Sequence, residues 1–241
     1  MPRRSTTRNP MFHRRRFADE IITLSIIWYL RFKLSYRDLS EIARQFGVLV
    51  APCTILRWVV RYAADFEQLW RQFERPAGGS WRADETYRKI RGRWVYLNRA
   101  VDSRGKTVES YLSHTRDMSA AKAFFRRALR HHGQPRTITL DGFEPSHAAL
   151  RRMGMRNEFN YRWDNPVKIR SCQYLNTVVK QDHRRIKARV GPMLGFKKFY
   201  NARRVLIGIE LIQKLVKGQY RVTPHKAWNN VDTWIQVLCC K

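Results

Sequence analysis

Apolar residues in the first part of the chain recur at helical spacing. The run at residues 21–30 is almost wholly apolar and follows arginines at residues 14–16. A signal peptide would begin in the same way, but this run is too short to cross a bilayer and Arg31 and Lys33 follow it directly. We therefore expect a buried helix at residues 21–30.

The next segment carries the signals of a helix, a turn and a second helix. Ser35 and Asp38 have the spacing of a capping box, Gly47 suits a helix end, and Pro52 can begin a new helix. Apolar residues share one face of each helix: Leu39, Ile42, Ala43 and Phe46 in the first, and Ile55, Trp58, Val59 and Tyr62 in the second. This order predicts a helix-turn-helix.

Arg57 and Arg61 fall on the other face of the second helix. In a helix-turn-helix the second helix enters the major groove, so we expect these two arginines to contact DNA. An ordinary helical hairpin with a solvated basic face would show the same pattern.

The second half of the chain alternates between strand and helix patterns. Strands are expected at residues 81–90, 93–101, 107–112, 136–140 and around 167–171, and helices at residues 118–132, 174–190 and 202–217. The last helix would bury Val205, Ile209, Ile212 and Val216. Trp58, Trp81 and Trp94 lie on apolar faces and are interpreted as packing residues, not base-stacking platforms.

These patterns divide the chain at a segment rich in turn formers. The expected organisation is a basic tail at residues 1–16, a helix-turn-helix region at 17–75, a linker at 76–80, an α/β domain with a mixed sheet at 81–219, and a C-terminal tail at 220–241.

Charge points to a polyanionic partner. Lys and Arg number 48 against 19 Asp and Glu, a formal net charge of +29, and the basic residues are spread along the whole chain. That spread favours nucleic acid over a membrane surface. A ribosome-associated or RNA-binding protein has the same charge balance, so charge alone does not identify an enzyme. The four cysteines show no zinc spacing, which suits a reducing cytoplasm.

Two acidic residues belong to the expected strands, one within a strand and one at the end of another. Asp84 lies in the first strand, and Asp141 ends the strand at 136–140. Hard divalent cations that assist phosphodiester chemistry require carboxylate oxygens on rigid elements, and adjacent strands could bring these two together. A salt-bridged strand residue and a routine Asp-Gly turn are the alternatives.

Long phrases of the sequence resemble a known family. WRADETYRKIRGRWVYLNRAVD, QYLNTVVKQDHRRIKARV and GPMLGFKKFYNARRVLIGIELIQKLVKGQ are similar to the DDE transposases of the bacterial insertion-sequence six family. The resemblance implies a ribonuclease-H-like domain that binds Mg²⁺ or Mn²⁺ through Asp84 and Asp141. It also implies cleavage and transfer of DNA strands, binding of terminal inverted repeats and target DNA, a homodimer on DNA, and a bacterial cytoplasmic, nucleoid-associated location.

The sequence departs from this family at the third ligand, where Lys180 stands in place of the expected glutamate. An ammonium cannot bind a metal ion and repels one. Asp182 is turned about 200° away along the helix, whereas Glu144 and Glu158 remain possible substitutes. A catalytically inactive relative that only binds DNA is therefore the alternative to an active transposase.

The face of the helix that carries Lys180 also carries His183, Arg184 and Lys187. We interpret this basic stripe as a contact for DNA phosphates, with a solvated helix face as the alternative.

Overall fold

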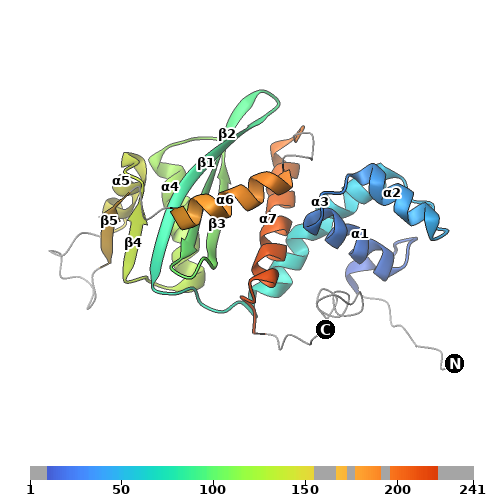
Figure 1. Cartoon of the computed structure of the whole chain (residues 1–241), viewed down its shortest axis with the longest axis horizontal. Coiled ribbons are helices and arrows are strands. Elements are labelled where there is room, and N and C mark those ends of the chain that lie inside the picture. The colour runs from blue at the N-terminus through green and yellow to red at the C-terminus, as the bar shows by residue number, and fades with distance from the viewer. Residues whose placement is uncertain (1–9, 155–166, 173–176, 191–195, 222–241) are drawn as a thin grey trace.

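The computed structural model describes residues 10–154, 167–172, 177–190 and 196–221. Figure 1 shows the sheet at one end of the molecule, the N-terminal helices at the other, and helix α7 (Phe199–Val216) between them. None of the helices in these ranges is long and apolar enough to cross a membrane.

The N-terminal part is helical, as its apolar periodicity predicts. A short 3-10 helix, η1 (Pro10–Phe12), precedes α1 (Asp19–Arg31), α2 (Tyr36–Gln45) and α3 (Pro52–Arg71). The Ser35 hydroxyl accepts backbone N–H groups at the start of α2 while the Asp38 carboxylate accepts the Ser35 N–H, which confirms the capping box. Gly47 adopts φ 74° in the turn, a backbone region that favours glycine.

Two residues of this part lie differently from what their segments suggest. Phe12 falls within the expected basic tail at residues 1–16, yet it is fully buried, and its ring stands edge-on to Tyr62 with 4.9 Å between the ring centroids. Phe46 was expected on the apolar face of α2, yet it is 76% exposed. The helix ends at Gln45, so Phe46 leaves the helical path and its side chain no longer follows the helical period.

The rest of the chain forms a five-stranded sheet in the order β3-β2-β1-β4-β5. The strands are β1 (Ser80–Ile90), β2 (Arg93–Asp102), β3 (Thr107–Ser113), β4 (Thr137–Leu140) and β5 (Lys168–Ser171). The first three are antiparallel neighbours, whereas β4 pairs in parallel with both β1 and β5. A parallel pair needs a crossover, and α4 (Met118–His132) supplies it between β3 and β4.

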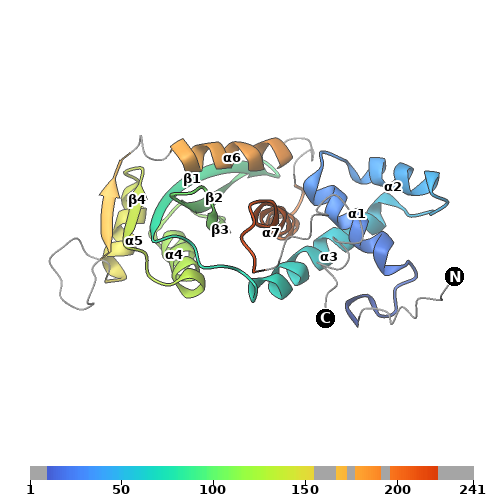
Figure 2. The same ribbon diagram turned by 60° about the horizontal axis from the view of Figure 1, so that its bottom comes forward.

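Helices cover both faces of the sheet (Figure 2): α4 lies on one face and α6 (Thr177–Val190) on the other, while α5 (Glu144–Arg152) follows β4. Trp81 on β1 packs with Phe124 and Phe125 of α4 in one hydrophobic core. The mixed α/β architecture predicted from the sequence is confirmed, and the strand at residues 136–140 begins one residue later than expected.

The expected linker at residues 76–80 is held in place. The Ala77 N–H bonds to His132 Nδ1, and the Gly78 N–H donates to the Asp102 carboxylate at 3.0 Å. The polar backbone of this segment is therefore fixed to α4 and β2.

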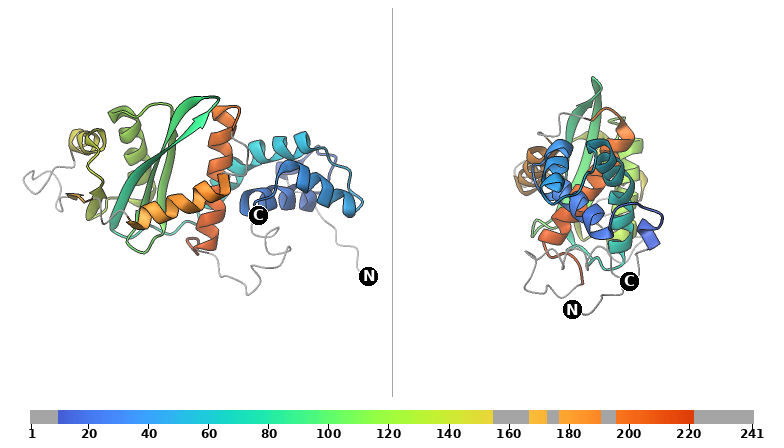
Figure 3. Two further views of the ribbon diagram at one scale, coloured as in Figure 1. Left: turned by 45° about the horizontal axis from the view of Figure 1, so that its top comes forward. Right: turned by 90° about the vertical axis from the view of Figure 1, so that its right-hand side faces the viewer.

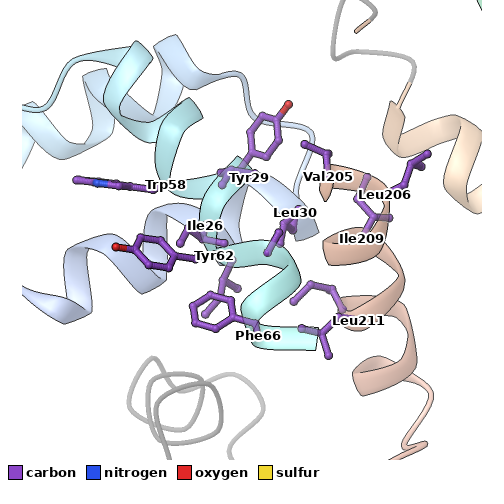
Figure 4. Close-up of a cluster of buried hydrophobic side chains, with 14 of the residues drawn as sticks. Ile26, Tyr29, Leu30, Trp58, Tyr62, Phe66, Val205, Leu206, Ile209 and Leu211 are labelled. Atoms are coloured by element: carbon purple, nitrogen blue, oxygen red, sulfur yellow. The ribbon is translucent and has the colours of Figure 1, made fainter. Parts of the chain in front are cut away.

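The N-terminal helices and the sheet share a hydrophobic core through α7. Side chains of α1, α3 and α7 interdigitate (Figure 4), and α7 lies between α3 and the sheet in the further views (Figure 3). Gly208 permits the closest approach, because a Cβ there would lie 2.7 Å from Leu30 Cδ1 and 2.9 Å from Ala63 Cβ. In the last turn Leu215 takes the buried position and Val216 is 60% exposed, so its expected burial is wrong.

A buried ionic network fastens α6 and α7 to β2. Arg99 is fully buried and pairs with Asp182 of α6 at 2.7 Å and with Glu210 of α7 at 2.5 Å. Lys217 approaches the other oxygen of Asp182 at 2.8 Å. Because one arginine joins three elements, this network fixes the position of α6 against the sheet.

The tryptophans differ in their burial. Trp58 and Trp81 are buried, which confirms their role in packing. Trp94 is 48% exposed on the β1–β2 hairpin, so its interpretation as a core residue is wrong. Trp94 lies on the face of the hairpin opposite Ile90 and Val95, which are buried in the core shared with α6 and α7.

Candidate active site

The two predicted acidic residues come together at one end of the parallel strand pair. Asp84 lies in β1, and Asp141 directly follows β4. The register pairs Arg82 with Thr139, so two more residues along each strand place Asp84 beside Asp141. These two residues are far apart in the sequence, and the crossover through α4 brings β4 alongside β1.

Asp84 is a buried carboxyl that interacts with the Asp141 carboxyl. Its side chain is 9% exposed. The pKa of Asp84 is raised to about 6, chiefly by burial and also by the negative charge of Asp141, while a backbone hydrogen bond from Glu85 opposes the rise. The two carboxyls are close enough to share a hydrogen bond when one is protonated. At neutral pH this pair is a concentrated negative charge, which a cation would stabilise.

Comparison with known proteins agrees with this geometry. A family model described as a DDE domain matches residues 78–219. The transposase for insertion sequence-like element IS431mec of Staphylococcus aureus is 37% identical over 210 residues, which cover 87% of this chain and 90% of that protein. The transposase for insertion sequence element IS257 in transposon Tn4003, also from Staphylococcus aureus, shows the same identity and coverage.

This chain belongs to the DDE transposases of the insertion-sequence six family. The resemblance found in the sequence is thereby confirmed. Among solved structures, this transposase aligns with the simian T-cell lymphotropic virus intasome in complex with PP2A regulatory subunit B56 gamma. The TM-score is 0.37 and the identity 14%, over 57% of this chain and 50% of that chain.

Lys180 lies on the exposed side of α6, near the acidic pair of the transposase. Its positive charge lowers the pKa of Asp84, opposing the effects of burial and of Asp141. Lys180, which stands where the resemblance in the sequence led us to expect the third acidic residue, is thus electrostatically coupled to Asp84.

His183, one turn beyond Lys180, differs from its expected place in an exposed basic stripe. Its side chain is 4% exposed, and Nε2 lies 3.9 Å from Asp84 Oδ2. Burial, with the charges of Arg99 and Lys187, lowers the pKa of His183 to about 3, so the imidazole is neutral at pH 7. Neither ring nitrogen makes a hydrogen bond within the described part of the chain. The side chain of His183 therefore faces the sheet, and its neutral ring lies next to Asp84.

The possible substitutes for the third acid are separated by the structure. Asp182 points into the buried network with Arg99 and Lys217, which confirms that it faces away from Lys180. Glu144 is exposed at the start of α5 and pairs with Arg151. Glu158 lies outside the described residues.

Glu85 is an acidic neighbour that sequence reasoning missed. Its side chain is 8% exposed and pairs with Arg116 at 2.5 Å, and the charges of Asp141 and Asp84 act on its pKa, which is raised chiefly by burial. Arg116 also lies over the Phe143 ring, 4.1 Å from its centroid. The signal in the sequence was its position directly after Asp84, but alternation along a strand predicts the opposite face.

Within the described ranges no group of three or more His, Cys, Asp or Glu side chains is arranged to hold a metal ion. The donor set that does fit a hard cation is the pair of carboxylates, since Mg²⁺ in proteins is bound through one or two carboxylates with water completing the shell. Asp84 and Asp141 meet that requirement for one ion.

Apart from His183, the basic residues predicted to contact DNA are exposed. Arg57 and Arg61 lie on the exposed side of α3, whereas Trp58 and Tyr62 are buried. Arg184 and Lys187 are exposed on α6. The structure makes these side chains available to a polyanion from two separate elements.

Proposed function

We propose that this transposase binds the terminal inverted repeats of its insertion sequence and cleaves and transfers their DNA strands, with Asp84 and Asp141 holding Mg²⁺ or Mn²⁺. The observation that carries the proposal is the meeting of these two carboxyls at the ends of β1 and β4, with the pKa of Asp84 raised to about 6. The family of transposases to which the chain belongs also supports the proposal.

Each part of the site has a chemical role in this proposal. Asp84 in β1 and Asp141 directly after β4 would hold the cation, and the Arg99 network fixes α6 against β2. A bound cation would supply charge stabilisation for displacement at a phosphodiester. His183 stays neutral and excludes water from the inner side of Asp84.

DNA binding is proposed on charge and exposure. Arg57 and Arg61 on α3 suit the major groove if α2 and α3 act as a helix-turn-helix, and Arg184 and Lys187 suit backbone phosphates beside the acidic pair. A homodimer on paired element ends and nucleoid association follow as part of the same proposal.

Lys180 favours a second candidate function: a transposase relative that occupies the terminal repeats without cutting them. Its ammonium acts on Asp84 and would compete with a divalent ion for the two carboxylates. Like charges a few Å apart cost on the order of 1 to 4 kcal/mol per unit charge, and a divalent ion doubles that.

The test is strand transfer of a labelled terminal-repeat duplex with Mg²⁺ or Mn²⁺, using the unmodified protein, Lys180→Glu and Asp84→Asn side by side. Activity of the unmodified protein that Asp84→Asn abolishes supports the transposase proposal. Activity of Lys180→Glu alone supports the binding-only candidate.

A second readout does not depend on activity. Mg²⁺ should raise the melting temperature of the unmodified protein saturably if the two carboxylates bind it, because a ligand stabilises the native state by mass action. No Mg²⁺ effect on the unmodified protein, with a clear effect on Lys180→Glu, would mean that the ammonium has replaced the ion. No effect on either protein would contradict the metal site at Asp84 and Asp141.

A further inference from the structure

The β1–β2 hairpin extends well beyond its neighbours. β1 pairs with β4 only at Ser80–Arg82, yet it pairs with β2 as far as Ile90 opposite Arg93. Arg91 and Gly92 close the hairpin with φ 50° and 76°, the left-handed pair that suits a two-residue turn. Figure 1 shows the tip of this hairpin projecting past the other strands. It is a rigid arm, because its ladder is complete to the tip.

One face of this arm carries exposed rings. Tyr87 and Trp94 are 59% and 48% exposed, their centroids are 5.0 Å apart, and their planes meet at 83°. Lys89 Nζ lies 4.7 Å from the Trp94 centroid, and Tyr96 is half-buried opposite Tyr87. We name Tyr87, Lys89, Trp94 and Tyr96 the aromatic hairpin patch.

The patch lies on the same face of the sheet as α4, beyond the part of that face that α4 covers. Trp81 and Ala83, earlier on the same face of β1, are buried in the core with α4, whereas Tyr87 and Lys89 are exposed. Cross-strand aromatic and cation–π contacts stabilise a hairpin by themselves, so the rings need a further argument before they indicate binding.

Charge supplies that argument. Arg88, Lys89, Arg91 and Arg93 are all exposed, and residues 86–97 contain no acidic side chain. Exposed rings combined with cations are the surface that binds unpaired nucleic acid, where bases stack on aromatic side chains and cations hold the backbone. A second copy of this same surface is disfavoured as the occupant, because residues 86–97 carry exposed cations and no acidic side chain, and two such segments would repel each other.

The patch lies close to the acidic pair along β1. Tyr87 follows Asp84 by three residues, a distance of about 10 Å along a strand. Among the described strands none pairs with β1 beyond Arg82 on the β4 side. Asp84 and Tyr87 point to opposite faces of β1, so the DNA strand would pass along this side of β1 to reach both.

We propose that the aromatic hairpin patch stacks on an unpaired base of the DNA strand being processed, roughly three nucleotides from the phosphate at Asp84 and Asp141. This inference rests on the proposed function, since it assumes that DNA is the substrate. It adds a preference for ends with unpaired bases over fully paired ends. The patch holds the strand, and it takes no part in breaking bonds.

The test compares binding of a blunt terminal-repeat duplex with the same duplex carrying a short oligo(dT) overhang. The variants are Tyr87→Ala/Trp94→Ala, the conservative Trp94→Phe, and Tyr200→Ala as a matched control at another exposed aromatic, which also has a cation, Arg204, 5.3 Å from its ring centroid. We expect the double variant to lose roughly 5- to 150-fold in affinity for the overhang DNA and little for the blunt duplex. Trp94→Phe and Tyr200→Ala should bind both DNAs as the unmodified protein does.

Other outcomes separate the ideas. Equal loss on both DNAs, or no loss on either, overturns the stacking proposal. Dissociation of a dimer by the double variant, measured by light scattering, would overturn it in favour of a second copy. If the unmodified protein binds neither DNA, the proposed function itself fails.

A direct readout covers the case in which the double variant does not fold. With 2-aminopurine in the overhang, binding of the unmodified protein should quench its fluorescence through stacking, and the same base placed within the duplex should be unaffected. Binding without any quenching overturns the proposal.

Discussion

Replacing Asp84 by asparagine is expected to stabilise the fold while it removes the proposed metal site. The Asp84 carboxyl is buried beside Asp141, and its pKa rises from the usual 3.8 to about 6. The free energy of unfolding then depends on pH, because the folded protein binds the Asp84 proton more tightly than the unfolded chain does. An asparagine side chain has similar shape and carries no charge at any pH.

The magnitude follows from the size of the shift. About two pKa units at 1.36 kcal/mol each give at most about 3 kcal/mol. For a chain of this length 1 kcal/mol moves the melting temperature by roughly 2–4 °C. Below the unfolded pKa both states are protonated and the stabilising contribution of neutral Asp84 is fully present. That contribution is lost as the pH rises through about 6, so the advantage of Asp84→Asn should grow between pH 4 and pH 6 and then stay constant.

The assay is chemical or thermal unfolding of both proteins from pH 4 to pH 8 in the presence of a chelator, with Glu41→Gln as a control at an exposed acid on α2. His183 acts in the opposite direction, since its folded pKa of about 3 costs stability as the pH falls below 6.5. Both proteins carry His183, so the difference between them reports mainly Asp84. A gap that is absent at pH 8, or equal at pH 4 and pH 8, would refute the reasoning. Saturating Mg²⁺ should narrow the gap by stabilising only the protein with both carboxylates.

Two further substitutions test the packing that positions the site. Arg99→Met should cost about 3–5 kcal/mol of unfolding free energy, because it leaves the Asp182 and Glu210 carboxylates buried without their partner; an effect below 1 kcal/mol in urea unfolding would contradict the network. Gly208→Ala should cost about 1–3 kcal/mol, because its Cβ would overlap the Leu30 side chain and Ala63 Cβ, and calorimetry that shows an unchanged melting temperature would contradict the close approach of α7.

Much of the fold could be predicted because its signals are local. The capping box at Ser35, the proline at the start of α3 and the alternation along β1 each depend on residues that are close in sequence. The exposed ends of elements were harder to predict. Phe46 and Val216 continue an apolar period in the sequence, but they stand where a helix ends, and burial there depends on what lies opposite.

The acidic pair could be found in the sequence and the surroundings of that pair could not. Asp84 and Asp141 were indicated by their strand positions and by the resemblance to transposases. The burial of His183 against Asp84 is decided by the rotation of α6, which the Arg99 network sets from β2 and α7. No spacing within α6 contains that information.

The sequence by itself determined the order of helices and strands and the basic character of the chain, and it showed Lys180 where the resemblance led us to expect a glutamate. Periodicity, capping and charge are properties of short segments, so they can be recognised in the sequence without knowledge of the fold. Only the tertiary structure decided that Trp94 is exposed on a projecting hairpin and that α7 joins the N-terminal helices to the sheet. Exposure and shared cores depend on contacts between residues far apart in the chain, and those contacts exist only once the layers have packed.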